Sequence, residues 1–132
     1  MQFKNLEDKC LYYRGLADYK LLPGSYVIVM LDGRSFSKLI KNKFEKPFDN
    51  NFINMMNETA KYVCSNVEGA KFGYVQSDEI SLILSDVKDP MFGGRVQKLT
   101  SVIASMYDLT FVIMQRFNRP RILKLINKNA RV

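Results

Sequence analysis

The order of apolar and polar segments predicts an α+β fold, in which a short helix precedes a βαββα unit and the beginning of a last strand. Two observations support it. Short apolar runs rich in β-branched residues, typical of strands, alternate with longer segments whose apolar residues recur at helical spacing. A βαββαβ order is the split βαβ arrangement of ferredoxin-like folds. With 132 residues and 47% hydrophobic residues, the whole chain, 1–132, is expected to form one domain with its own core.

The N-terminal part is predicted to form a helix and then the first strand. Residues 6–20 place leucines and tyrosines among polar residues at amphipathic spacing, and Pro23-Gly24 is expected to end this helix. The core of the domain is expected over 25–117. Its first segment, Tyr26–Leu31, is continuously apolar and rich in β-branched residues, which predicts a central strand covered on at least one face.

A second helix is predicted after the first strand. Residues 37–50 are polar and are expected to form a connection. Asp49 or Asn50 has the side chain of a helix N-cap, and the apolar residues that follow fall near helical spacing over about 50–66.

The rest of the chain is predicted to form a hairpin, a long helix and a basic connection. Ala70–Asp78 and Ile80–Ser85 are apolar or alternating on either side of a polar turn, which predicts two antiparallel strands. A helix over about 95–116 follows, whose inward face is expected to include Leu109. Residues 118–132 are expected to lead into an incomplete last strand.

The charge of the chain is unevenly distributed. The formal net charge is +7, and no acid follows Asp108. Such asymmetry favours a polyanionic partner, most plausibly nucleic acid, although a solvated basic tail is the alternative. The basic residues after Asp108 are Arg116, Arg119, Arg121, Lys124, Lys128 and Arg131, of which the first four are candidate RNA-binding residues.

The composition excludes several kinds of site. The chain has no histidine, so it contains no Ser-His-Asp triad, no His-ligated zinc and no imidazole acid–base catalyst. Cys10 and Cys64 are too few for a zinc knuckle or a disulfide framework, and we expect them to be reduced and partly buried. No apolar run has the length of a membrane span and the N-terminus lacks a signal pattern, so a cytoplasmic protein without a membrane partner is expected.

Acidic residues follow two of the predicted strands. Asp32 comes directly after the first strand, and Asp78 and Glu79 lie in the turn before the third. In a βαββαβ sheet the first and third strands are antiparallel neighbours, so these acids should meet at one edge. Such carboxylates can hold two Mg²⁺ ions roughly 3.5–4 Å apart for phosphoryl transfer. Gly33 would let the backbone approach a phosphate or offer a carbonyl to a metal. The alternative is two ordinary turns.

Four segments of the chain form a distinctive set. They are Leu31-Asp32-Gly33-Arg34-Ser35-Phe36, Lys46-Pro47-Phe48-Asp49, Gly73–Ser81 and Gly94–Val102. Together they resemble the motifs of one family, the tRNA-His guanylyltransferase superfamily, and more closely its Thg1-like branch. They occur in the family's order and at similar spacing, and the resemblance covers most of residues 6–117. It implies a polymerase palm domain that adds nucleotides to the 5′ end of tRNA, in the 3′–5′ direction, with two Mg²⁺ ions.

The resemblance also implies roles for individual residues. Asp32 and Asp78 would ligate the two Mg²⁺ ions with the Gly33 carbonyl assisting, and Glu79 would support the site. Independently of the resemblance, Arg95 and Lys98 lie three residues apart at the start of the predicted long helix, and a helix N-terminus favours the binding of phosphate. The alternative is that both side chains are simply solvated. The residues implied to contact the nucleotide are Arg34, Ser35 and Phe36 through their backbone, Lys46 and Ser77 at the phosphates, and Arg95 and Lys98 at a triphosphate.

The chain departs from the family pattern at its C-terminal end. Family members carry a His-Ile-Asn-Asn-type motif, which a chain without histidine lacks. Asn129 occupies the position of the Asp in the family's Phe-Asp-Ala-Arg-Val segment, which starts the fourth palm strand. We therefore expect a palm truncated at its C-terminus, whose first strand has an outer edge that is unpaired or covered by a partner chain. A homo-oligomer, dimer or tetramer, is one such arrangement.

The leading hypothesis is a Mg²⁺-dependent nucleotidyltransferase that uses GTP or another nucleoside triphosphate in tRNA processing or repair. The metal ions would lower the pKa of a nucleotide 3′-hydroxyl, so no side-chain base is needed. A second hypothesis is a non-catalytic nucleotide- or RNA-binding palm that lost the half needed to activate the 5′ end. A third, a nucleotide cyclase, is disfavoured because the chain has no Gly-Gly-Asp/Glu-Glu-Phe-like turn.

Overall fold

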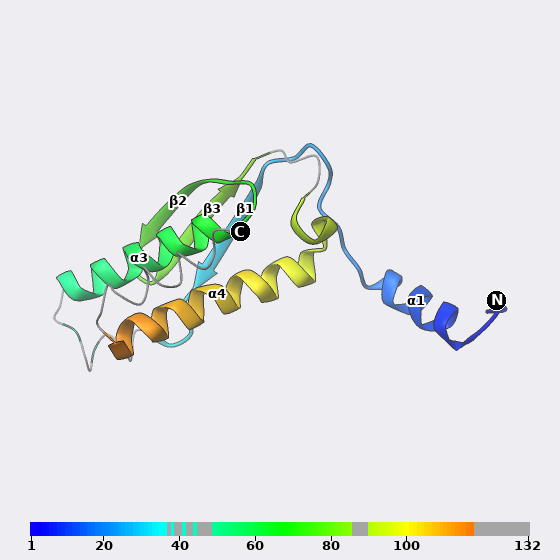
Figure 1. Cartoon of the computed structure of the whole chain (residues 1–132), viewed down its shortest axis with the longest axis horizontal. Helices are drawn as coiled ribbons and strands as arrows, with labels where there is room; N and C mark the ends of the chain where they lie inside the picture. The colour runs from blue at the N-terminus through cyan, green and yellow to red at the C-terminus, as the bar shows by residue number, and fades with distance from the viewer. Residues whose placement is uncertain (37, 39–40, 42–43, 45–48, 86–89, 118–132) are drawn as a thin grey trace.

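The computed structural model describes residues 1–36, 38, 41, 44, 49–85 and 90–117, and it contains a three-stranded antiparallel sheet with two helices packed on one face (Figure 1). The strands lie in the order β1-β3-β2, and the elements follow the predicted βαββα order, which confirms the α+β class. The elements are α1 (Leu6–Leu16), β1 (Val27–Asp32), α3 (Asn50–Asn66), β2 (Ala70–Gln76), β3 (Glu79–Leu84), a short 3-10 helix η1 (Met91–Gly94) and α4 (Val96–Phe117).

The strand register confirms the predicted pairing of the first and third strands. Leu31 of β1 lies opposite Ile80 of β3, and Asp32 lies opposite Glu79. Because side chains alternate between the faces of a sheet, Leu31 and Ile80 are buried beneath the helices while Asp32 and Glu79 are exposed. On the same open face Ile28 and Met30 are 66% and 71% exposed, so β1 is covered on one face, as predicted.

The core lies between the sheet and helices α3 and α4. Residues four apart on α4, from Leu99 to Phe111, form its buried stripe. Leu109 falls outside this stripe and is 62% exposed, so the prediction that it faces inward is wrong. The buried apolar residues are Leu31, Phe36, Phe52, Met56, Ala60, Val63, Val67, Ile80, Leu82, Leu84, Leu99, Ile103, Tyr107 and Phe111.

Helix α3 begins as predicted. Asp49 is its N-cap, and the Asp49 Oδ1 atom accepts a hydrogen bond from the Phe52 N–H at 3.0 Å. The helix packs closely on β2 at Gly73, where an added Cβ would lie only 2.5 Å from the Cys64 Sγ atom. Burial raises the pKa of the Cys64 thiol. Cys10, which was also expected to be partly buried, is exposed on α1, and both cysteines are free.

The polar connection predicted over 37–50 is partly helical. Phe36, Lys38 and Lys41 have helical conformation, and the Lys38 N–H donates to the Ser35 carbonyl at 3.1 Å. The buried ring of Phe36 packs on Phe111, 4.7 Å between centroids, which anchors this turn to α4. A contact with a residue so distant in sequence leaves no periodic signal in the segment itself.

Helix α1 is shorter than the predicted 6–20, since it ends at Leu16. The chain after it pairs with the start of α4: the Leu21 N–H donates to the Gly94 carbonyl at 2.8 Å, and the Val96 N–H donates to the Tyr19 carbonyl at 2.9 Å. These bonds require an extended backbone and therefore stop the helix. Helix α1 buries no residue and extends away from the sheet and the other helices (Figure 1).

Among the described residues, β1 pairs with β3 alone, so its other edge has no strand beside it. This edge borders a groove of about 210 Å³ between β1 and α4, with lining residues that include Met30 and Ile103. The predicted incomplete last strand, in 118–132, lies outside the described residues.

Candidate metal and nucleotide site

Three acids meet at one end of the sheet, where β1 ends and β3 begins. Asp32 ends β1, Glu79 lies directly opposite it at the start of β3, and Asp78 immediately precedes Glu79 in the turn that follows β2. Gln76 of β2 flanks Glu79 on its other side. We refer to Asp32, Asp78 and Glu79 as the acidic edge. The topology thus brings together the acids that the sequence placed on separate strands.

The turn that contains Asp78 is tied to helix α4. The Tyr107 hydroxyl donates a hydrogen bond of 2.6 Å to the backbone carbonyl of Asp78. Tyr107 is 4% exposed. In the turn itself, Ser77, the residue before Asp78, has a φ of 54°, a left-handed conformation that a non-glycine residue adopts at a cost. Burial raises the pKa of Tyr107, and the negative charges of Asp78, Asp32 and Asp108 raise it further. Tyr107 therefore lies within the electrostatic range of both acid-bearing segments.

The turn after Asp32 is fixed by an aromatic ring. Phe36 folds back over Gly33, so a Cβ at Gly33 would lie only 2.4 Å from the Phe36 Cγ atom. The Phe36 ring also stacks on Tyr107, 6.1 Å between centroids. Ser35 reverses the chain with a φ of 57°. The sequence suggested that Gly33 serves close approach to a ligand; the structure adds that glycine is needed to accommodate Phe36.

Replacing Gly33 with alanine is expected to lower the free energy of unfolding by about 1–3 kcal/mol, because the Phe36 ring is held on its other side by Phe111 and has little room to move. Urea denaturation would measure this. The matched control is Gly15→Ala in α1, where nothing lies within 4 Å of the added Cβ and where alanine favours the helix. Equal stability of Gly33→Ala and the wild type would contradict the packing described here.

The donor atoms of the acidic edge suit magnesium bound together with a nucleotide. Asp32 and Glu79 are exposed and Asp78 is half-buried. In the described part of the chain, no group of three or more His, Cys, Asp or Glu side chains is positioned to hold a metal ion by itself. Mg²⁺ is ordinarily bound by one or two carboxylates, with waters and substrate phosphates completing its octahedron. The residues present therefore fit that ion.

Several predicted nucleotide-binding residues lie beside the acidic edge. Arg34 and Ser35 are exposed in the turn after Asp32, and Ser77 is exposed in the turn before Asp78. The ring of Phe36 points into the core, so only its backbone remains for a ligand, as the resemblance implies. Four predicted residues, Lys46, Arg119, Arg121 and Lys124, lie outside the described residues, and Arg116 is described only as part of the α4 backbone.

Arg95 and Lys98, by contrast, are not placed with the acids. Helix α4 runs from the far end of β3, near Leu84, back toward the acidic edge, so its N-terminus lies at the opposite ends of the strands from the acids. Along the axis of α4, Lys98 lies about 14 Å from Tyr107, the residue that contacts the Asp78 turn. Its Nζ atom lies 4.7 Å from the centroid of the Phe92 ring. Both residues lie at the start of α4, as predicted from the sequence, but that helix terminus lies at the other end of the sheet from the acids. Their contact with a triphosphate stays a prediction.

Arg95 has a protein partner. Its Nε atom donates to both carboxylate oxygens of Asp18 at 2.9 Å, with the side chains of Arg95 and Asp18 25% and 16% exposed. Asp18→Asn and Arg95→Gln are each expected to lower the free energy of unfolding by about 1–3 kcal/mol. The double variant should lose little more than either single one, because both changes remove the same interaction. Denaturation of Lys9→Gln, an exposed lysine of α1, is the control; additive losses in the double variant would show that the pair does not interact.

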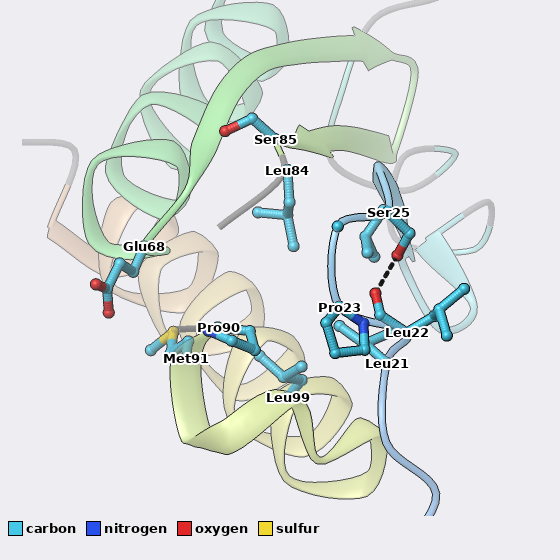
Figure 2. A pocket seen from close by; sticks show the side chains of 12 residues that line it. Leu21, Leu22, Pro23, Ser25, Glu68, Leu84, Ser85, Pro90, Met91 and Leu99 are labelled. Carbon is cyan, nitrogen blue, oxygen red and sulfur yellow. Dashed lines mark hydrogen bonds between the residues drawn. The ribbon is translucent and has the colours of Figure 1, made fainter. Parts of the chain in front are cut away.

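The pocket in Figure 2 lies away from the acidic edge. Its volume is about 30 Å³, and it lies between the segment Leu21–Ser25 and the start of α4, next to the far ends of β1 and β3 at Val27 and Leu84. The side chains that line it are mostly apolar (Figure 2). It has room for about one water molecule and brings no group of charged side chains together, so it is not the candidate site.

The residue that sequence reasoning missed is Tyr107. The available signal was a tyrosine on the stripe of α4 that also carries Leu99, Ile103 and Phe111. A buried tyrosine hydroxyl normally has a hydrogen-bond partner, so a tyrosine on a core stripe predicts a polar contact. The partner, a backbone carbonyl, could not be identified from the sequence.

Comparisons with known proteins agree with the fold and with the motifs. The family model of tRNAHis guanylyltransferase, Thg1, matches residues 8–130. The chain is 35% identical over 103 residues to tRNA(His) guanylyltransferase of Schizosaccharomyces pombe, and 37% identical over 114 residues to the uncharacterized protein R259 of Acanthamoeba polyphaga mimivirus. These matches cover 77% and 79% of this chain, but 38% of either relative.

Solved structures are similar as well. A bacterial tRNA(His) guanylyltransferase (Thg1)-like protein in complex with GTP superposes with a TM-score of 0.80 at 34% identity, covering 87% of this chain and 56% of that one. The tRNA(His) guanylyltransferase from Saccharomyces cerevisiae superposes with a TM-score of 0.69 at 29% identity, and the match covers 78% of this chain and 46% of that one. No helix of the described residues is both long and apolar enough to cross a membrane. The family match over nearly the whole chain, together with this fold, shows that the chain belongs to the tRNAHis guanylyltransferase family.

Proposed function

We propose that this chain binds a nucleoside triphosphate with Mg²⁺ at the acidic edge and transfers the nucleotide to the 5′ end of a tRNA, in the 3′–5′ direction. The observation that supports it most is the register, which sets Asp32 opposite Glu79 and next to Asp78 at one end of the sheet. Membership of the family, and the similarity to a bacterial relative solved with GTP, support the same chemistry.

In this reaction the 3′-hydroxyl oxygen of the incoming nucleotide forms a bond to the α-phosphorus of an activated RNA 5′ end, the phosphorus attached to the 5′ oxygen of the RNA. The activating group leaves with the electron pair of the broken P–O bond, and the hydroxyl proton passes to solvent. Mg²⁺, when bound, would lower the pKa of that hydroxyl and neutralise the developing negative charge. Asp32 and Asp78 would hold it, with the Gly33 carbonyl assisting and Glu79 close by.

The remaining residues of the site would orient the nucleotide. Exposed Ser77 and Arg34 flank the acids from the two turns, where hydroxyl, guanidinium and backbone N–H groups can donate to phosphate oxygens. The proposed reaction passes the proton of the hydroxyl to solvent and therefore uses no side-chain general base. Activation of the hydroxyl by metal requires none, which agrees with a chain that lacks histidine.

A second candidate is a nucleotide-binding palm without turnover. Among the described residues, no group of three or more His, Cys, Asp or Glu side chains could hold a metal ion by itself, and this observation favours the alternative. Both candidates place GTP and Mg²⁺ at the acidic edge, and they differ only in whether a covalent bond forms.

Two measurements on the same preparation distinguish these candidates. Calorimetry with GTP and Mg²⁺ would detect binding, and incubation of labelled GTP with 5′-phosphorylated or 5′-triphosphorylated tRNA would detect transfer. Binding with transfer, both abolished by EDTA, supports the enzyme. Binding without transfer on any such RNA identifies the binding module, and the absence of both would overturn the assignment of the acidic edge.

A further inference from the structure

We propose that Tyr107 is a positioning residue, which sets the distance between the two halves of the acidic edge by bonding to the Asp78 backbone directly and supporting the turn after Asp32 through Phe36. The inference rests on the proposed function, because it concerns the same metal site. Asp32 ends β1 and Asp78 lies in the turn before β3, and the pairing of Asp32 with Glu79 joins the two segments through the sheet. Tyr107 of helix α4, on the covered face of the sheet, joins the two segments a second time, through its contacts with Asp78 and Phe36.

The first contact is with the Asp78 half. The Tyr107 hydroxyl donates to the carbonyl oxygen of Asp78 at 2.6 Å, a short hydrogen bond. That carbonyl belongs to the peptide plane between Asp78 and Glu79, so one bond fixes the orientation of the backbone that carries both acids. The turn needs such a restraint because Ser77 holds a left-handed φ of 54°.

The second contact is with the Asp32 half. The Tyr107 ring stacks on Phe36 with an interplanar angle of 23°, and Phe36 in turn packs against Gly33, the residue after Asp32. Phe111 supports the other side of Phe36 at 4.7 Å. An unbroken series of contacts therefore runs from Gly33 through Phe36 and Tyr107 to the Asp78 carbonyl.

The electrostatic surroundings define what the hydroxyl can do. Burial and the charges of Asp78, Asp32 and Asp108 raise the pKa of Tyr107 above its ordinary value. The partner of the hydroxyl is a backbone carbonyl oxygen, which can only accept, so the bond itself requires the phenol to carry its proton. A neutral donor also leaves the negative charge of the acidic edge undiminished for a cation.

The test removes the hydroxyl alone. Tyr107→Phe keeps the ring that stacks on Phe36, so the core should stay filled while the bond to Asp78 is lost. We expect the affinity for Mn²⁺ in the presence of GTP, followed by electron paramagnetic resonance, to fall about tenfold or more, and the Mg²⁺ concentration for half-maximal GTP transfer to rise by a similar factor. Circular dichroism would confirm that the variant is folded.

Two controls separate positioning from stability. Tyr62→Phe removes the hydroxyl of a half-buried tyrosine of α3, and Val63→Ala removes methyl groups of a fully buried core residue on the same helix. Val63→Ala should lower the midpoint of thermal unfolding and leave the Mn²⁺ affinity unchanged. A role confined to packing would give Tyr107→Phe the same behaviour as Val63→Ala.

The outcomes also separate this inference from the proposed function. If the wild type binds Mn²⁺ through Asp32 but transfers no nucleotide, the proposed function fails, and the Mn²⁺ titration of Tyr107→Phe still decides the inference. Folded Tyr107→Phe with wild-type Mn²⁺ affinity would overturn the inference, as would a wild type without any Mn²⁺ site that depends on Asp32.

Discussion

Replacing Asp32 or Asp78 with asparagine is expected to lower GTP transfer to the tRNA 5′ end by at least about a hundredfold. Asparagine has nearly the same shape as aspartate, so the register that places Asp32 opposite Glu79 should persist. What is lost is the negative charge that would hold the divalent ion close to the reacting phosphate. Single-turnover rates at saturating GTP would measure the chemical step directly.

The matched control for these variants is Glu68→Gln. Glu68 is an exposed acid in the connection between α3 and β2, at the other end of the sheet from the acidic edge, so its replacement changes the net charge equally. Its transfer rate should stay within about twofold of the wild type, since surface charges far from a site act weakly through salt. Equal losses in Glu68→Gln and Asp32→Asn would mean that net charge, rather than a local site, controls the activity.

Replacing Phe111 with alanine should have the largest effect on stability, about 3–5 kcal/mol of unfolding free energy. Phe111 is 1% exposed, and its ring packs against Phe36 and, edge-on at 6.2 Å, against Phe52. Its truncation would leave a cavity beneath the turn that follows Asp32. Because small domains are stable by only about 5–15 kcal/mol, much of the fold's margin would be lost.

Urea denaturation of Phe111→Ala beside Leu109→Ala tests this prediction. Leu109 lies on the same helix two residues away and is 62% exposed, so its truncation should change stability by less than about 0.5 kcal/mol. A loss in Leu109→Ala as large as that in Phe111→Ala would contradict the assignment of the buried stripe of α4.

The parts of the fold that were predicted correctly are those set by short-range signals. Helix α3 was predicted over its observed range because Asp49 is a recognisable N-cap and the residues after it are apolar at helical spacing. The pairing of β1 with β3 was predicted because the βαββα order permits few topologies. From that topology alone the meeting of Asp32 with Asp78 and Glu79 could be inferred.

The parts that were not predicted depend on contacts between distant residues. Helix α1 ends early because the segment after it pairs with the start of α4, and the Asp18–Arg95 ion pair joins residues 77 positions apart. The Tyr107–Asp78 hydrogen bond spans 29 positions. Local periodicity contains no information on such pairs. The sequence likewise does not show that α4 begins at the opposite end of the sheet from the acids, and the contact of Arg95 and Lys98 with a triphosphate stays a prediction.

The most direct test is the position of the label after incubation of α-labelled GTP and Mg²⁺ with 5′-triphosphorylated tRNA, for the wild type and Asp32→Asn side by side. We expect label at the 5′-terminal position with the wild type, mapped by nuclease digestion, and almost none with Asp32→Asn. The absence of 5′ label with the wild type, or equal label with both proteins, would contradict the proposed function.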